Sequence, residues 1–333
     1  MKTVLIFQGG GPLGAFGCGA WQALAPWLAA EGHPVVALGG TSIGAFNAAL
    51  IRPHLGAPDG GAGELARVWR DRIAVPSLPF LGMPWGTSPW ASELRSWNGL
   101  LTGMFAGNGL YTPNLPGWSP WGLLHRTQAP LFDRARMWRL MTEELPPYRS
   151  QSPRDALLFA ASADVADGTL VLHDSDAAEV GPVQVGASSA MPVLFDPVPI
   201  DGRLQWDGEL VRASPLEPVL RKVRDSGRAG RDEPLLLVTV EQMPQPAARL
   251  PRSGPELAYR ALNLTQIGKL AAGASRGLHC LRVARPALPS DGVSGLFDHS
   301  NERIDDLIAL GAEAARAAVA GGQAARPAAT EVA

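Results

Sequence analysis

The chain has little cysteine, no excess of charge of either sign and no long apolar run. Only Cys18 and Cys280 occur among 333 residues, too few for a disulfide framework or a cysteine metal set. The formal net charge is -2 and the basic residues form no block, which argues against nucleic acid as a partner. No apolar stretch approaches the roughly 20 residues that span a bilayer, so any membrane contact is expected to be peripheral.

The amino terminus also lacks the features of a secretory signal. The apolar run that ends at Phe7 is too short, and glycines follow it at once with no plausible cleavage region. Together with the two isolated cysteines, this predicts a reducing compartment and a cytoplasmic protein. No pattern of metal ligands is present, and we expect neither a metal nor a cofactor.

Strand-like and helix-like segments alternate along most of the chain. Residues 3–7 and 35–38 are short apolar runs that glycines end, and residues 15–30 and 43–51 follow them as helices. This alternation predicts an α/β fold, with a mainly parallel central sheet and helices on both of its faces. Further strands are expected at 156–163, 169–173, 204–206, 235–240 and 279–283, and further helices at 183–190, 215–225, 255–276 and 301–320.

The middle of the chain departs from this pattern. Seven of the ten tryptophans lie between Trp69 and Trp138, and regular periodicity is poor from Pro76 to Pro130. We interpret residues about 70–140 as a Trp- and Pro-rich cap or lid inserted into a single domain that spans residues 1–320. Residues 321–333, rich in Ala and Pro, are expected to be a disordered tail.

A G-x-S-x-G motif lies between an expected strand and an expected helix. In it, Ser42 stands between Gly40 and Gly44, at a sharp turn that would lift the serine out of the sheet. The flanking glycines remove side chains that would crowd such a turn. The motif predicts a nucleophile elbow, although a serine that merely caps the helix would give the same five residues.

A second glycine-rich segment follows the first expected strand. Gly9, Gly10 and Gly11 leave their N–H groups unobstructed at the start of a helix, where an anion or a developing oxyanion can be held. The segment also fits G-x-G-x-x-G, so a dinucleotide site is an alternative. That fingerprint expects an acidic residue at the end of the second strand, where Gly39 and Gly40 stand instead.

A serine nucleophile needs a base, and no histidine stands in an evident catalytic setting. If a Ser-His-Asp triad were present, the sequence would not reveal its histidine. Asp207, followed by Gly208 after a short expected strand, is the better candidate, although an Asp-Gly pair is often an ordinary turn. The six histidines are His33, His54, His125, His173, His279 and His299.

Taken together, these segments resemble the patatin-like phospholipase family. The glycine-rich loop, G-T-S-I-G at 40–44, the stretch 187–198 and D-G-E at 207–209 occur in the order of the family, over roughly residues 1–315. The resemblance implies a three-layer α/β/α sandwich and a Ser-Asp dyad, with Ser42 as nucleophile and Asp207 as base. It also implies an oxyanion hole made by the glycine loop.

Two residues depart from the pattern of the family. Leu13 stands where many members have Lys or Arg, and Glu209 stands where the motif is usually D-G-G or D-G-A. A glutamate at that position adds negative charge near Asp207 and could alter its pKa or the entry of substrate.

The expected activity is hydrolysis of a phospholipid or another fatty acyl ester through an acyl-enzyme, as a phospholipase A, a lysophospholipase or an esterase. One alternative is transfer of the acyl group to an alcohol. Another is a module that binds lipid or nucleotide without turnover. The Trp-rich insert is expected either to pack as a cap or to contact the membrane surface, where tryptophan is favoured.

Overall fold

A computed structural model describes most of the chain. It covers residues 1–77, 94, 97–99, 101, 110–120, 122, 130–243, 250, 254–266, 268–271, 277–288, 291 and 297–321. Trp85, Trp90 and Trp121 of the expected insert, and all but the first residue of the expected tail, lie outside these ranges.

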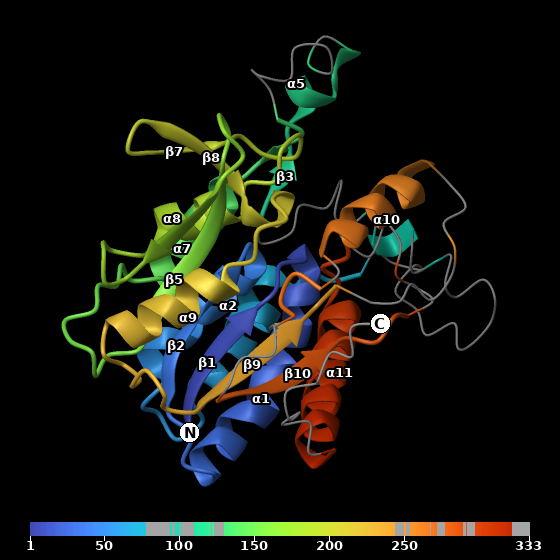
Figure 1. The fold of residues 1–333 in the computed structure, drawn as a ribbon. Coiled ribbons are helices and arrows are strands. Elements are labelled where there is room, and N and C mark those ends of the chain that lie inside the picture. Colours follow the sequence, from blue (N-terminus) through green and yellow to red (C-terminus); the bar gives the residue numbers. More distant parts are fainter. Residues whose placement is uncertain are drawn as a thin grey trace, which may run out of the picture.

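The centre of the molecule is an eight-stranded sheet (Figure 1). Its order is β10-β9-β1-β2-β5-β8-β7, and β6 also pairs with β5. Strands β10, β9, β1, β2 and β5 run parallel, whereas β6 and β8 each pair antiparallel with β5 and β7 pairs antiparallel with β8, which confirms the mainly parallel sheet. The strands are β1 (Lys2–Phe7), β2 (Val35–Thr41), β5 (Leu157–Asp164), β6 (Leu170–Asp174), β7 (Val198–Ile200), β8 (Arg203–Asp207), β9 (Leu235–Glu241) and β10 (Leu278–Ala284).

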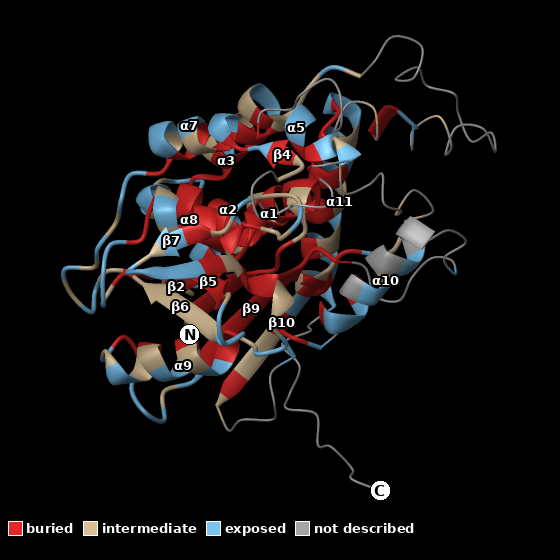
Figure 2. Cartoon of the chain, turned by 90° about the horizontal axis from the view of Figure 1, so that it is seen from above, coloured by how far each residue is buried: buried red, intermediate tan, exposed pale blue. Residues whose placement is uncertain are grey.

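The strands alternate their buried side chains between two apolar cores, one on each face of the sheet, and helices cover both cores. In β1, Leu5 and Phe7 join the larger core, whereas Val4 and Ile6 point to the smaller one. The larger core is covered by α1 (Gly14–Ala30), α2 (Ile43–Ile51), α3 (Ala62–Arg67), α7 (Ala135–Glu144) and α11 (Asn301–Ala320), and the smaller by α9 (Leu216–Asp225). Figure 2 shows the buried residues concentrated in the strands and in α1 and α2. The three-layer α/β/α arrangement is therefore confirmed.

Two glycines allow the helices that flank the sheet to approach each other closely. A Cβ atom at Gly19 of α1 would lie 1.8 Å from the carbonyl oxygen of Ile308 in α11. A Cβ atom at Gly311 of α11 would lie 2.0 Å from the carbonyl oxygen of Phe16. Because real side chains never approach a backbone atom so closely, this pairing of α1 with α11 requires glycine at both positions.

One expected helix is shorter than predicted. Helix α10 covers Gly254–Gln266 and does not continue to residue 276, because residues 268–271 form a turn that begins at Gly268 with φ +74°. The described part of the expected insert contains a π-helical turn (Val68–Ile73), a two-stranded ribbon of β3 (Thr112–Pro113) and β4 (Phe132–Asp133), and α5 (Leu115–Trp118). No helix of the described residues is long and apolar enough to span a bilayer.

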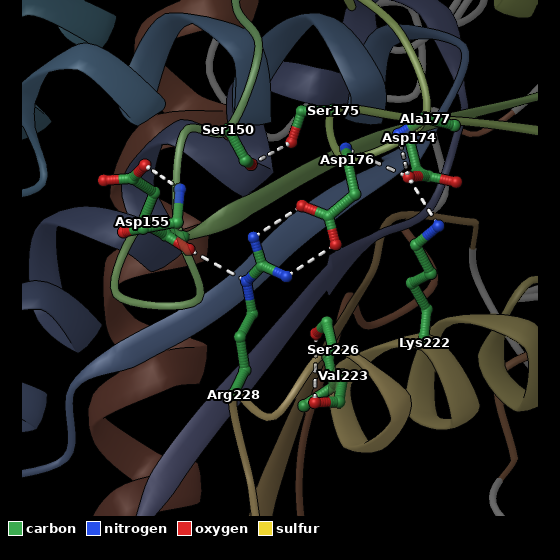
Figure 3. A network of polar contacts seen from close by, with 12 residues as sticks. Ser150, Asp155, Asp174, Ser175, Asp176, Ala177, Lys222, Val223, Ser226 and Arg228 are labelled. Atoms are coloured by element: carbon green, nitrogen blue, oxygen red, sulfur yellow. Dashed lines mark hydrogen bonds and ion pairs between the residues drawn. The ribbon is translucent and has the colours of Figure 1, made fainter.

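A buried polar network fastens the end of α9 to the loops beside β5 and β6 (Figure 3). Arg228 donates through Nη1 and Nη2 to both carboxylate oxygens of Asp176, at 2.6 and 2.7 Å, and through Nε to the carbonyl oxygen of Asp155 at 2.8 Å. Lys222 of α9 pairs with Asp174 at 3.1 Å. The Arg228 side chain is only 1% exposed, whereas its partner Asp176 is 20% exposed, so the cation is buried and the carboxylate is partly accessible.

Candidate active site

Ser42 occupies the turn between β2 and α2, with φ 57° and ψ -131°. A residue with a side chain rarely adopts positive φ, and such strain gathers at functional sites. The Ser42 side chain does not cap α2, although the residue stands at the N-cap position. Its backbone N–H donates to Oγ of Ser188 at 2.9 Å, and Ser188 in turn donates to the carbonyl oxygen of Ala161. Because Ser188 stabilises the turn through hydrogen bonds, the Ser42 hydroxyl is not engaged in capping α2 and is available to interact with other groups.

The glycines of the motif are needed because the turn lies against β1. A Cβ atom at Gly40 would lie 2.1 Å from the carbonyl oxygen of Phe7, and one at Gly44 would lie 2.4 Å from the same atom. Phe7 and Gly40 are direct partners in the parallel pairing of β1 and β2. The loops that follow these two strands therefore emerge side by side at the carboxyl edge of the sheet, where α/β folds place their sites.

Asp207 ends β8 and meets Ser42 at this edge. Its carboxylate accepts the backbone N–H of Glu209 at 2.9 Å, and hydrogen bonding by the Ser42 side chain lowers the pKa of Asp207, so the two side chains lie close together. Asp207 is only 1% exposed. Burial, followed by the negative charge of Glu209, raises the pKa of Asp207 to about 7, against the opposing effect of its hydrogen bonds and of Lys269. The fold therefore brings both predicted dyad residues into contact.

The glycine loop leaves two of its three expected donors available. Gly10 has φ +149° and Gly11 has φ +57°, and both line the cavity above Ser42. Among the described residues, neither of their N–H groups has a hydrogen-bond partner. Pro12 has no N–H to add.

Gly9 differs from its two neighbours in the loop. Its N–H donates to Oε1 of Glu209 at 2.8 Å, so this amide has a partner within the protein. A role of Gly9 in the oxyanion hole therefore stays a prediction, and in this structure Gly10 and Gly11 are the loop residues with available N–H groups.

Two residues that the sequence analysis missed complete the surroundings of Glu209. Nζ of Lys269 lies 3.1 Å from Oε2 of Glu209 and 2.9 Å from the carbonyl oxygen of Gly208. Nε2 of Gln266 donates to the carbonyl oxygen of Glu209 at 2.5 Å. Neither residue belongs to a motif, and only their place in the fold reveals them.

An apolar cavity of about 170 Å³ opens over Ser42. Aromatic and aliphatic side chains form most of its wall, whereas the polar side chains of the wall are those of Ser42, Ser189, Asp207, Glu209, Gln266 and His299. Such a lining suits a hydrocarbon chain whose polar end meets the serine. The apolar lining residues are Pro12, Ile43, Leu110, Tyr111, Phe132, Met137, Met191, Leu194, Phe195, Met243 and Phe297.

In the described part of the chain, no histidine is hydrogen-bonded to Ser42. His173 bonds instead to Ser162 and Gln205 within the sheet. His299 lines the cavity, where burial lowers its pKa to about 4 and Nδ1 lies 2.9 Å from the carbonyl oxygen of Phe297. No group of three metal-ligating side chains gathers anywhere in the described ranges.

Comparison with known proteins identifies a family and, among the solved structures that match, a distant one. The family model described as patatin-like phospholipase matches residues 5–220. The crystal structure of VipD from Legionella pneumophila is similar to 96% of this chain and 67% of its own, with 12% sequence identity and a TM-score of 0.41. No curated protein matches the chain.

Proposed function

Because the chain belongs to the patatin-like phospholipase family, a family of lipid acyl hydrolases, we propose that it cleaves fatty acyl esters with Ser42 as nucleophile and Asp207 as general base. The observation that carries this proposal is that Ser42 and the buried Asp207 line the same cavity, with the Ser42 side chain close enough to lower the pKa of the Asp207 carboxyl by hydrogen bonding. Phospholipids and lysophospholipids belong to the substrate class that the family and the apolar cavity favour.

In the first step, Asp207 accepts the proton of the Ser42 hydroxyl as the oxygen attacks the ester carbonyl. A carboxylate is ordinarily a weak base for a hydroxyl, but burial raises the pKa of Asp207 to about 7, which makes it a stronger one. The contact also fixes the direction of the hydroxyl, so that positioning contributes to the rate.

The tetrahedral intermediate then places a negative charge on the former carbonyl oxygen. The N–H groups of Gly10 and Gly11 have no partner among the described residues, both glycines line the cavity, and these two amides form the proposed oxyanion hole. Collapse of this intermediate expels the alcohol, which takes the proton from Asp207, and leaves an acyl-enzyme on Ser42. A water molecule that loses its proton to Asp207 then releases the fatty acid and restores the serine.

We further propose that the face around the cavity meets lipid surfaces. Leu115 is 77% exposed and Trp118 is 38% exposed, both in α5. Trp118 packs against Phe132 of the cavity wall, with ring centroids 5.9 Å apart, and its Nε1 donates to the carbonyl oxygen of Leu131. Exposed apolar side chains next to the cavity would lower the cost of moving a lipid from a membrane to Ser42.

The decisive experiment measures hydrolysis of a p-nitrophenyl acyl ester and of a panel of phospholipids, with mass-spectrometric detection of products. We expect Ser42→Ala to abolish turnover and Asp207→Asn to reduce kcat by a factor on the order of 10²–10⁴. Ser226→Ala, which removes a hydroxyl from the network of Figure 3, is the matched control and should retain full activity. An active Ser42→Ala protein would eliminate the proposed nucleophile, and an added alcohol acceptor distinguishes hydrolysis from acyl transfer.

A further inference from the structure

The side chain of Glu209 lies between the glycine loop and Lys269. One carboxylate oxygen, Oε1, accepts the N–H of Gly9 at 2.8 Å, and the other, Oε2, lies 3.1 Å from Nζ of Lys269. Lys269 also donates to the carbonyl oxygen of Gly208, at 2.9 Å. The three contacts link the loop after β1, the turn after β8 and the turn after α10, segments that are remote in sequence.

This ion pair is enclosed by the protein. The Lys269 side chain is 2% exposed and that of Glu209 is 9% exposed. Removing two charges from water is costly, and a buried ion pair is therefore weak evidence for stability alone. Its hydrogen bonds are well formed, and one of them ends on the loop that carries the proposed oxyanion donors, which suggests a role in positioning.

The packing at Gly9 allows the loop little freedom. A Cβ atom on Gly9 would lie 2.8 Å from Cγ of Glu209 and 3.0 Å from Cβ of Ser42, so the loop backbone is pressed between these two side chains. The amides of Gly10 and Gly11 follow directly in the chain. Gly10 and Gly11 both adopt positive φ. Each N–H lies in the plane of the peptide before it, so holding the loop at Gly9 constrains the direction of the N–H groups that follow.

We propose that Glu209, paired with Lys269, is a positioning residue that fixes the glycine loop at Gly9 and so aims the amides of Gly10 and Gly11 at the reacting carbonyl above Ser42. The inference rests on the proposed function for its effect on catalysis, whereas the anchoring of the loop can be tested without activity. It gives a structural role to Glu209, the residue at which the chain departs from the motif of the family. It also explains how the loop is held although Leu13 carries no charge.

The same pair influences the electrostatics of the proposed base. The negative charge of Glu209 raises the pKa of Asp207, and the positive charge of Lys269 lowers it. Arg134, whose own pKa is lowered to about 10 by burial, is a further charged group that interacts with Asp207, and His299 lines the same cavity. Removing the charge of Glu209 should therefore move the acidic limb of the pH–rate profile to lower pH, which a purely structural contact would not do.

Two double variants isolate the hydrogen bond to Gly9. Glu209→Gln with Lys269→Met removes both charges but keeps a carbonyl oxygen that can accept the Gly9 N–H. Glu209→Leu with Lys269→Met removes both charges and that acceptor as well, with a side chain of similar size. Because the two proteins carry the same net charge, any difference between them reports on the contact to the loop.

We expect kcat of the leucine variant to be about 10- to 100-fold below that of the glutamine variant, with KM within about twofold, since the loss of one oxyanion donor outright costs roughly 10²–10³. Hydrogen exchange measured by mass spectrometry on the peptide of residues 8–14 should be faster in the leucine variant. Arg228→Met removes another buried cation from an ion pair, at a residue that does not line the cavity, and should change neither quantity.

If the leucine variant does not fold, Glu209→Asp replaces it, because a side chain shorter by one methylene cannot reach both Gly9 and Lys269 and should show the same loss. Equal exchange in the glutamine and leucine variants would overturn the anchoring of the loop. Faster exchange with unchanged kcat would overturn its link to catalysis. Hydrolysis that survives Ser42→Ala refutes the proposed function instead, while the exchange experiment still decides whether Glu209 holds the loop.

Discussion

Replacement of Asp207 by asparagine should stabilise the folded protein while it removes the proposed base. The carboxylate is buried, and its pKa is raised from 3.8 to about 7, mainly by burial and then by the charge of Glu209. Above its raised pKa the buried carboxyl is ionised, and keeping that charge buried lowers the free energy of unfolding. Asparagine has no such form, and its oxygen can still accept the N–H of Glu209 that Asp207 accepts at 2.9 Å.

The size and sign of the effect follow from the two pKa values. Below pH 4 the carboxyl is protonated in both the folded and the unfolded chain, and the substitution should change little. Between pH 4 and 7 the folded state retains a proton that the unfolded chain releases, so the stability of the wild type falls relative to the variant as the pH rises. Each pKa unit corresponds to about 1.4 kcal/mol, which gives a difference on the order of 4 kcal/mol at pH 8. For a chain of 333 residues this corresponds to a rise in Tm of about 6 °C.

The assay is thermal unfolding by circular dichroism or calorimetry at intervals from pH 4 to pH 9. The gap in Tm between Asp207→Asn and the wild type should open through pH 4–7 and remain constant above that window. Asp232→Asn, in an exposed turn before β9, is the matched control and should show no such opening. A Tm at pH 8 that is equal to or below that of the wild type, or a gap independent of pH, would refute the reasoning.

Two further predictions concern the pH dependence of catalysis and the binding of phospholipid vesicles. The acidic limb of kcat/KM should have its midpoint near pH 7, because only the ionised form of Asp207 accepts the Ser42 proton, and a midpoint near 4 in initial-rate measurements would contradict a base in this buried setting. Leu115→Ser with Trp118→Ser should reduce co-sedimentation with phospholipid vesicles, whereas Leu204→Ser, an equally simple change at an exposed leucine of β8, should not. Undiminished sedimentation of the double variant would count against contact through α5.

Local features of the sequence were sufficient for most of the elements and for the turn that carries Ser42. Helices α2 and α11 have the bounds that their apolar periodicity and caps predict, Ile43–Ile51 and Asn301–Ala320. The strand, turn and helix around Ser42 are equally local, since the glycines on either side permit the sharp bend. Helix α10 was predicted too long because a single glycine, Gly268, outweighed a helical composition that continues beyond it.

The partners of these residues were decided by the tertiary structure. The resemblance to the family named Asp207 as the partner of Ser42, but only the antiparallel pairing of β8 with β5 shows how the fold brings the two residues together. The sequence predicted Gly9 as an oxyanion donor, but its N–H donates to the carboxylate of Glu209, which is 200 positions away in the sequence. Lys269 and Gln266 carried no signal at all.

The physical reason lies in the range over which each effect acts. Periodicity, capping and glycine conformations depend on neighbours within a few residues, so the sequence by itself determined the strands, the helices and the exposed bend at Ser42. Burial, pKa and hydrogen bonding depend on which segments pack together. Only the packed sheet and its loops therefore decided that Asp207 faces Ser42 and that Glu209 and Lys269 hold the glycine loop.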